Sequence, residues 1–254
     1  MFKHKILFTF IISALILFSA AFAFSAEPDP KTLFLEANIY YEKGDYNKAI
    51  ELYEGIINEG YKSGALYYNL GGAYFKNNKL GLAILNYERA EKIMPRDADL
   101  NANYKFAESK ITGNKILPAK SFWNWKPLKT YAGSFNANEF TSFASGTYLL
   151  IIMLAVIAIV RPEIKRNIFI IAGILSIFVL LNAAILYHEI TSTRAVTVVS
   201  KAEVLFGPFD SGTKFFTLQE GMVSVITKEK DDWYKVRCED GKVGWVKKSA
   251  LEKV

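Results

Sequence analysis

Two long uncharged stretches dominate the pattern of hydrophobic and polar positions along the chain. Residues 140–160 (FTSFASGTYLLIIMLAVIAIV) and 167–187 (NIFIIAGILSIFVLLNAAILY) each run for 21 residues without a charged side chain. A helix of that length spans the hydrocarbon core of a bilayer, which is about 30 Å thick. We predict two transmembrane helices, with a buried soluble hairpin as the alternative, and small residues such as Gly146 and Gly173 favour their close approach.

The six residues between these stretches, RPEIKR (161–166), carry three positive charges and one negative charge. Such a loop fits the cytoplasmic side of a membrane by the positive-inside rule. Lys120, Lys126 and Lys129 precede the first stretch and nearly balance this bias. Orientation therefore depends on how the chain begins, because two crossings return it to the side on which it started.

The amino terminus has the three parts of a secretory signal. The basic MFKHK is followed by the apolar run ILFTFIISALILF and then by small residues in SAAFAFSAE. We predict a signal peptide at 1–26, cleaved after Ala23 or Ala26, with an uncleaved anchor helix as the alternative. Export of the following segment predicts a multi-pass protein of the bacterial inner membrane with both soluble domains in the periplasm.

The predicted soluble segment at 27–112 contains an internal repeat. A shift of 34 residues aligns ANIYYEKGDYNKAIELYEGI with GGAYFKNNKLGLAILNYERA, and this period and these residue types resemble the tetratricopeptide repeat. Small residues at Gly71 and Ala83 predict closely packed helix pairs, and Pro95 predicts the end of a helix. A fifth helix at about 97–111 is expected to cap the stack.

The resemblance implies a concave, aromatic groove that would bind an extended peptide or a partner helix. Its expected residues are Phe34, Asn38, Tyr41, Tyr68, Gly72, Phe75 and, on the cap, Phe106. The alternative is that several of these side chains pack against the cap or the next segment.

Residues 113–139 form a predicted linker in which aromatic and basic side chains alternate. Phe122, Trp123 and Trp125 lie among lysines shortly before the first apolar stretch, a composition typical of the membrane interface. The alternative is that the tryptophans dock onto the repeat domain. A second, short linker is expected at 188–194.

Residues 195–254 change to short β-rich runs separated by turn signals. The six runs are AVTVV, EVLFGPF, KFFTL, VSVIT, WYKVR and GWVKK, and they predict a small barrel or sandwich. Asp240-Gly241 is a tight-hairpin signal, because glycine tolerates a positive φ. The order of the runs and turns resembles bacterial SH3 domains, which implies a small all-β, SH3-like barrel that binds peptides, cell-wall components or proteins.

Aromatic side chains of this segment would line a groove for an extended ligand. The candidate ligand-binding residues are Phe206, Phe209, Trp233, Tyr234 and Trp245. The alternative is that the tryptophans support the core, since a domain of this size has little apolar area to spare.

Composition excludes several chemistries. The formal net charge is +6, of which Lys3 and Lys5 would leave with the signal, and the remainder is too scattered for nucleic-acid binding. Cys238 is the single cysteine, and the two histidines are His4 and His188, so we expect no metal site, no cofactor and no enzyme activity. Carboxylates such as Glu88 are expected on helix surfaces without a converging partner.

In order and size, these segments resemble the BatE proteins of bacterial aerotolerance operons. The resemblance implies a scaffold that works beside von Willebrand-type membrane proteins and a MoxR-type ATPase in stress tolerance or envelope protein assembly. A second hypothesis is an envelope sensor or anchor that binds peptidoglycan through the SH3 domain. An enzyme is the third class, with His188 as a candidate that fits an interfacial structural role better.

Overall fold

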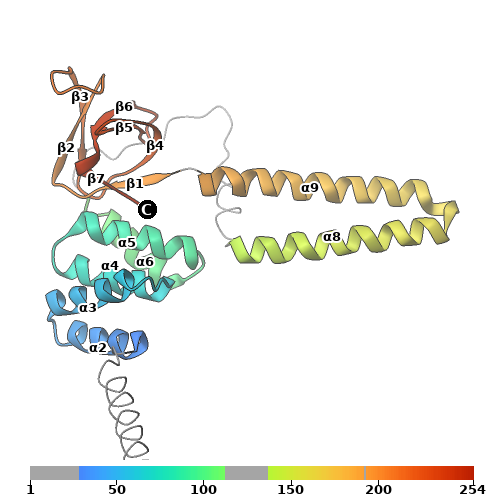
Figure 1. Ribbon diagram of the computed structural model, residues 1–254, viewed down its shortest axis with the longest axis horizontal. Helices are drawn as coiled ribbons and strands as arrows, with labels where there is room; N and C mark the ends of the chain where they lie inside the picture. The colour runs from blue at the N-terminus through green and yellow to red at the C-terminus, as the bar shows by residue number, and fades with distance from the viewer. Residues whose placement is uncertain (1–28, 112–136, 192) are drawn as a thin grey trace, which may run out of the picture. The chain divides into compact units, whose positions relative to one another are not determined.

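The structure is a computed structural model that describes residues 29–111, 137–191 and 193–254 (Figure 1). The predicted signal at 1–26 and most of the predicted linker at 113–139, including its tryptophans, lie outside the described residues. The helices of the described chain are α2 (Pro30–Glu42), α3 (Tyr46–Asn58), α4 (Gly64–Lys76), α5 (Leu80–Ile93), α6 (Ala98–Glu108), α8 (Ala137–Val160) and α9 (Lys165–Thr191). Its strands are β1 (Arg194–Thr197), β2 (Lys201–Leu205), β3 (Lys214–Gln219), β4 (Val223–Lys230), β5 (Trp233–Arg237), β6 (Val243–Lys247) and β7 (Leu251–Lys253).

The first compact unit ends at Tyr61 and contains α2 and α3, which pack against each other. Ala37 of α2 and Ala49 of α3 have no exposed surface, and such small side chains allow two helices to approach closely. Asp45 begins α3, because its side chain accepts a hydrogen bond from the backbone N–H of Lys48 at 3.2 Å. This pair is the first copy of the repeat seen in the sequence.

The second compact unit begins with α4 and α5, the second copy of the repeat. A Cβ atom on Gly71 would lie 2.8 Å from ring atoms of Tyr87 and 3.2 Å from the carbonyl oxygen of Ala83. These distances are shorter than ordinary van der Waals contacts. The predicted close packing at Gly71 and Ala83 is therefore confirmed.

The helix α6 follows α5 and packs against it. Asp97 starts α6 by accepting a hydrogen bond from the backbone N–H of Leu100 at 2.8 Å. Glu88 of α5 departs from the sequence expectation, since it is only 3% exposed instead of lying on a helix surface. Side chains from α6 and from β1 enclose and pair with its carboxylate, as described below.

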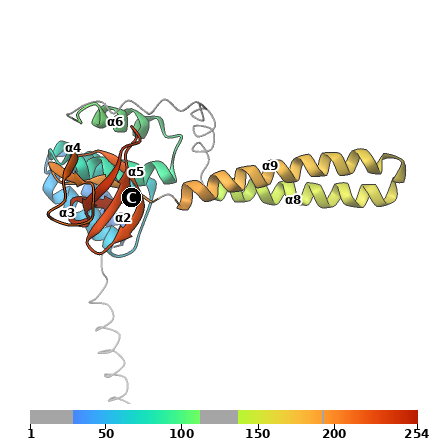
Figure 2. The same cartoon turned by 90° about the horizontal axis from the view of Figure 1, so that it is seen from above.

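The helices α8 and α9 are long and apolar enough to cross a membrane. They lie side by side (Figures 1 and 2), with the ring centroids of Phe143 and Phe178 6.1 Å apart. Only 11% of Thr141–Val160 and 6% of Arg166–Ala184 are buried. A core helix of a soluble protein is mostly buried, so this exposed apolar surface favours a lipid environment.

Two details of this hairpin differ from the sequence expectation. The turn is shorter than 161–166, because a 3₁₀ turn at Pro162–Ile164 leads directly into α9 at Lys165, and proline suits the first turn of a helix. Gly146 and Gly173 do not bring the helices together, since a Cβ atom on either would meet nothing within 4 Å. The most buried of the described side chains of the two helices are Thr147, Ala158 and Ile168.

The strands form a sheet in the order β3-β2-β6-β5-β4-β1-β7, and every neighbouring pair is antiparallel. The first six correspond to the six β-rich runs, whereas the short β7 was missed because three residues carry no readable alternation. In the turn between β5 and β6, Gly241 has a φ of 85°, and the backbone N–H of Lys242 donates to Asp240 Oδ1 at 2.9 Å. The predicted tight turn is therefore confirmed.

The core of the β domain is built from the inward-facing side chains of this sheet. Its buried members are Ala195, Ala202, Val204, Leu218, Tyr234, Val236, Cys238, Val246, Ala250 and Leu251. Phe216 and Ile226 pack against this cluster while keeping some exposed surface. The outward-facing positions of the same strands are therefore the ones available to a ligand.

Candidate binding surfaces

Two residues of the predicted repeat groove, Phe75 of α4 and Phe106 of α6, are in direct contact. Their ring centroids are 5.6 Å apart at an interplanar angle of 61°, an edge-to-face geometry that aromatic pairs favour. Phe106 remains 53% exposed, and the ammonium of Lys110 lies 4.6 Å from its ring centroid. The pair offers an accessible aromatic surface with an adjacent positive charge.

Tyr68 of α4 also faces α6. Its hydroxyl accepts a hydrogen bond from Asn103 Nδ2 at 2.6 Å, and its ring centroid lies 6.1 Å from that of Tyr87. Partial burial raises the pKa of Tyr68, so the phenol stays neutral at physiological pH. Tyr68 thus joins α4 to the cap helix. This contact agrees with the alternative that several of the predicted groove residues pack against the cap.

The predicted groove residues of the first unit contact the neighbouring helix α3. The ring centroid of Phe34 is 5.8 Å from that of Tyr53, and Asn38 Oδ1 accepts a hydrogen bond from the Tyr53 hydroxyl at 2.6 Å. Tyr41 lies against Tyr46 with ring centroids 5.5 Å apart. All three side chains hold α2 and α3 together, and a further role in binding stays a prediction.

Three of the predicted ligand residues of the β domain are buried or half-buried within the domain. Trp233 and Tyr234 are 7% and 8% exposed. Trp245 is half-buried opposite Leu205 in the β2–β6 pairing, and the ammonium of Lys235 lies 5.8 Å from its ring centroid. Only the accessible edges of these rings can meet a ligand.

The other two predicted ligand residues are strongly exposed. Phe206 and Phe209, in the loop from β2 to β3, are 61% and 54% exposed, and Phe215 at the start of β3 is 41% exposed. The ring centroids of Phe206 and Phe215 are 4.4 Å apart. We call these three residues the aromatic tip; exposed aromatic clusters of this kind mark binding surfaces.

Sequence reasoning missed Phe215 as a candidate. Phe215 and Phe216 are consecutive in β3, and side chains alternate between the two faces of a strand. Phe216 packs against the core, so Phe215 must point outward. The signal was therefore present in the sequence, but it required knowing which of the two rings faces the core.

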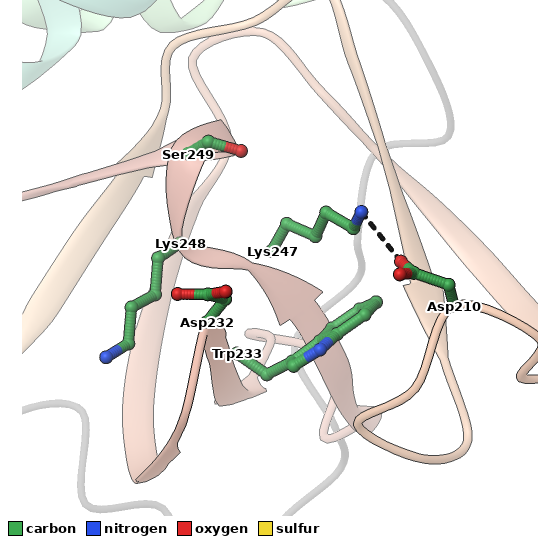
Figure 3. Close-up of a pocket in the computed structure, with 6 residues that line it drawn as sticks. All are labelled: Asp210, Asp232, Trp233, Lys247, Lys248 and Ser249. Atoms are coloured by element: carbon green, nitrogen blue, oxygen red, sulfur yellow. Dashed lines mark ion pairs between the residues drawn. The ribbon is translucent and has the colours of Figure 1, made fainter.

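A small hollow lies beside the loop that carries Asp210 (Figure 3). It has a volume of about 340 Å³ and is lined by Asp210, Asp232, Trp233, Lys247, Lys248 and Ser249. The Lys247 ammonium pairs with Asp210 Oδ1 at 2.7 Å and lies 5.6 Å from the Trp233 ring centroid. Both signs of charge line this hollow, which suits a polar ligand that carries an amino group and a carboxylate.

The single cysteine of the chain is not positioned for chemistry. Cys238 is buried in the β-domain core, and burial raises its pKa to about 12, so the thiol is protonated at physiological pH. Reactive cysteines require a thiolate and access to solvent. Among the described residues, no group of three His, Cys, Asp or Glu side chains lies close enough to hold a metal ion.

Comparison with known families agrees with this architecture. The family model of the tetratricopeptide repeat matches residues 30–58 and 64–97, and that of the bacterial SH3 domain matches residues 201–253. No curated protein matches the chain. The predicted fold class is confirmed: α-helical tetratricopeptide repeat hairpins, two long apolar helices, and a small all-β, SH3-like domain.

Proposed function

We propose that the chain is a membrane-anchored scaffold that presents two recognition modules on the periplasmic face of the bacterial inner membrane. The observation that carries the proposal is the joining of a tetratricopeptide region and a bacterial SH3 domain to two exposed apolar helices in one chain. Both kinds of module bind proteins or cell-wall material. The helices α8 and α9 would hold them at the membrane.

The number of membrane crossings supports the placement of both modules on one side. The repeat region precedes α8 and the β domain follows α9, so two crossings return the chain to its starting side. Arg161 in the turn and Arg166 at the start of α9 are exposed and positively charged, which favours the cytoplasm for that end of the hairpin. The secretory composition of residues 1–26 then favours the periplasm for both modules.

The order of segments supports a finer assignment to the BatE-like proteins of aerotolerance operons. On that assignment, von Willebrand-type membrane proteins and a MoxR-type ATPase system would be the partners, and the process would be stress tolerance or envelope protein assembly. The proposal gives the chain no catalytic step. Its contribution would be to bring partners together at the membrane.

Crosslinking and mass spectrometry of neighbours in native membranes test the scaffold proposal. We expect membrane or periplasmic proteins to crosslink to the wild-type chain, and Phe106→Ala to reduce recovery of at least one of them about tenfold, as loss of a central aromatic contact does. Tyr61→Ala is the matched control, because Tyr61 is 52% exposed and lies outside the predicted groove. Recovery of no such neighbour with the wild-type chain would rule the scaffold out.

The hollow beside the aromatic tip favours a second candidate function. Cell-wall peptides carry free amino and carboxylate groups, which match the lysines and aspartates of the hollow. On this alternative, the chain is an envelope sensor or anchor that binds peptidoglycan. Sedimentation of the full chain in detergent with purified peptidoglycan tests it, with Asp210→Asn/Lys247→Met as the variant expected to stay in the supernatant. A wild-type chain that also stays in the supernatant would remove this candidate.

A further inference from the structure

The β domain and the second repeat meet at a place where two backbones come unusually close. A Cβ atom on Gly81 of α5 would lie 2.6 Å from the carbonyl oxygen of Thr197 in β1. The backbone N–H of Gly81 donates to Glu220 Oε1 at 2.8 Å. The first turn of α5 is thus fitted to the β domain by the absence of a side chain at position 81.

A buried ionic group lies about two turns further along the same helix. Glu88 is 3% exposed, and Arg194 Nη1 of β1 donates to its Oε2 at 2.9 Å. The hydroxyl of Tyr104, from α6, donates to the other carboxylate oxygen. Because a buried carboxylate is costly unless it is paired, this arrangement favours the state in which α5, α6 and β1 are together.

Contacts around the rim of this interface follow the same helix face. Arg89 Nη2 donates to the carbonyl oxygen of Lys253 at 2.9 Å, and Lys92 Nζ donates to that of Val254 at 3.3 Å. A Cβ atom on Gly221 would lie 3.3 Å from a side-chain carbon of Ile84, which itself has no exposed surface. The interface therefore combines an apolar centre, a buried ion pair and a polar rim.

The aromatic tip lies at the other end of the β2–β3 ribbon. Lys201 pairs with Gln219 next to Glu220, whereas Leu205 pairs with Lys214, and Phe206 follows Leu205 directly. Five strand residues separate the two ends by about 14 Å. Contact with α5 at the Glu220 end therefore leaves the tip uncovered.

We propose that the SH3 domain is the partner that covers the α5 face of the repeat, so that α4, α5, α6 and the β domain form one docked head. Within this head, the aromatic tip points away from the contact with α5 and stays available to ligands. The head is tied closely to the membrane anchor, because β1 begins at Arg194 and α9 ends at Thr191. Docking of this kind requires both modules on one side of the membrane, but it does not depend on which ligand either module binds.

Intramolecular crosslinking of the purified full chain in detergent tests the docked head. Arg89→Cys and Lys253→Cys place two thiols on the rim, and a short bis-maleimide joins them only while the modules are docked. Cys238 adds little background because it is buried and its pKa is about 12. We expect rapid linking between positions 89 and 253, identified by mass spectrometry of the linked peptides.

Two further glycine variants in the same background separate docking from general effects of a larger side chain. Gly81→Leu places a side chain that would clash with the Thr197 backbone, and it is expected to slow linking about tenfold or more, since the effective concentration of the second thiol falls. Gly55→Leu is the matched control, because Gly55 also lies within a helix and a Cβ atom there would meet nothing within 4 Å. Arg194→Met is expected to slow linking as well, which keeps the test informative if Gly81→Leu loses helical content.

Slow linking in the parent pair, or equal rates in the Gly81→Leu and Gly55→Leu chains with Arg194→Met also unaffected, would overturn the docked head. That result would leave the proposed scaffold standing, because capture of neighbours in native membranes is measured separately and needs no contact between the modules. If positions 89 and 253 link rapidly but no neighbour is captured in native membranes, the docked head stands and the scaffold is rejected.

Discussion

At the scale of single residues, Glu88 has no distinctive signal in the sequence, yet its side chain connects α5 to α6 and to β1. Its carboxylate is buried between Tyr104, 16 residues away on the next helix, and Arg194, which is 106 residues away along the chain. Burial and the nearby Glu88 carboxylate raise the pKa of Tyr104 well above its ordinary value. Tyr104 is therefore neutral at physiological pH and remains a hydrogen-bond donor to Glu88.

Removal of the Arg194 guanidinium should destabilise the folded chain, because the Glu88 carboxylate would stay buried without its cationic partner. Arg194→Met is expected to lower the free energy of unfolding by about 2 kcal/mol, because Glu88 loses a charged hydrogen bond while it stays buried. Urea unfolding of the full chain in detergent, followed by tryptophan fluorescence, measures the change. Lys214→Met is the control, since its ion pair with Glu203 is exposed on both sides and should be worth less than about 1 kcal/mol. Equal losses in the two variants would contradict the role assigned to Glu88.

The thiol of Cys238 gives a second prediction at this scale. At pH 8 its labelling by Ellman's reagent should be about a thousandfold slower in the folded chain than in guanidinium, because burial raises the pKa from near 9.0 to about 12 and little thiolate is present. The folded state holds this proton more tightly, so the contribution of the thiol to stability is complete below pH 9 and declines as the pH rises toward 12. Fast labelling at pH 8 in the folded chain would show that the β-domain core is open.

At the scale of helices and strands, the sequence predicted what depends on local pattern. The repeat period placed Gly71 and Ala83 in a helix contact, and alternation placed the first six strands. The outward position of Gly146 could not be predicted, since an apolar helix gives no stripe that defines its contact face. The contact of Glu88 with Arg194 could not be predicted either, because a separation of 106 residues leaves no local signal.

Helix packing in the second repeat gives a prediction at this scale. Gly71→Leu is expected to destabilise the repeat by about 1–3 kcal/mol, the usual cost of overpacking, because the new side chain meets Tyr87 and the Ala83 backbone. Gly55→Leu again serves as the control and should be neutral or slightly stabilising, because leucine is the better helix former. Thermal unfolding followed by circular dichroism at 222 nm, where α-helices dominate the signal, separates the two variants. Indistinguishable midpoints would show that α4 and α5 do not pack as described.

At the scale of the whole molecule, two recognition modules are joined by one hairpin of two long apolar helices. The apolar surfaces of α8 and α9 are left exposed by the rest of the chain, and the repeat and the β domain meet through α5 and β1. A short basic turn between the helices would then be the main cytoplasmic exposure of the mature chain. Every part of the proposed function depends on the two modules lying on the same, periplasmic side.

Alkaline phosphatase fusions test that placement most directly, because the enzyme is active only after export. A fusion at Val254 reports the side of the β domain, and a fusion at Glu163, within the 3₁₀ turn between the helices, reports the opposite side. If both modules are periplasmic, the fusion at Val254 is active and the fusion at Glu163 is inactive, at comparable levels of fusion protein. An inactive fusion at Val254 together with an active one at Glu163 would contradict it.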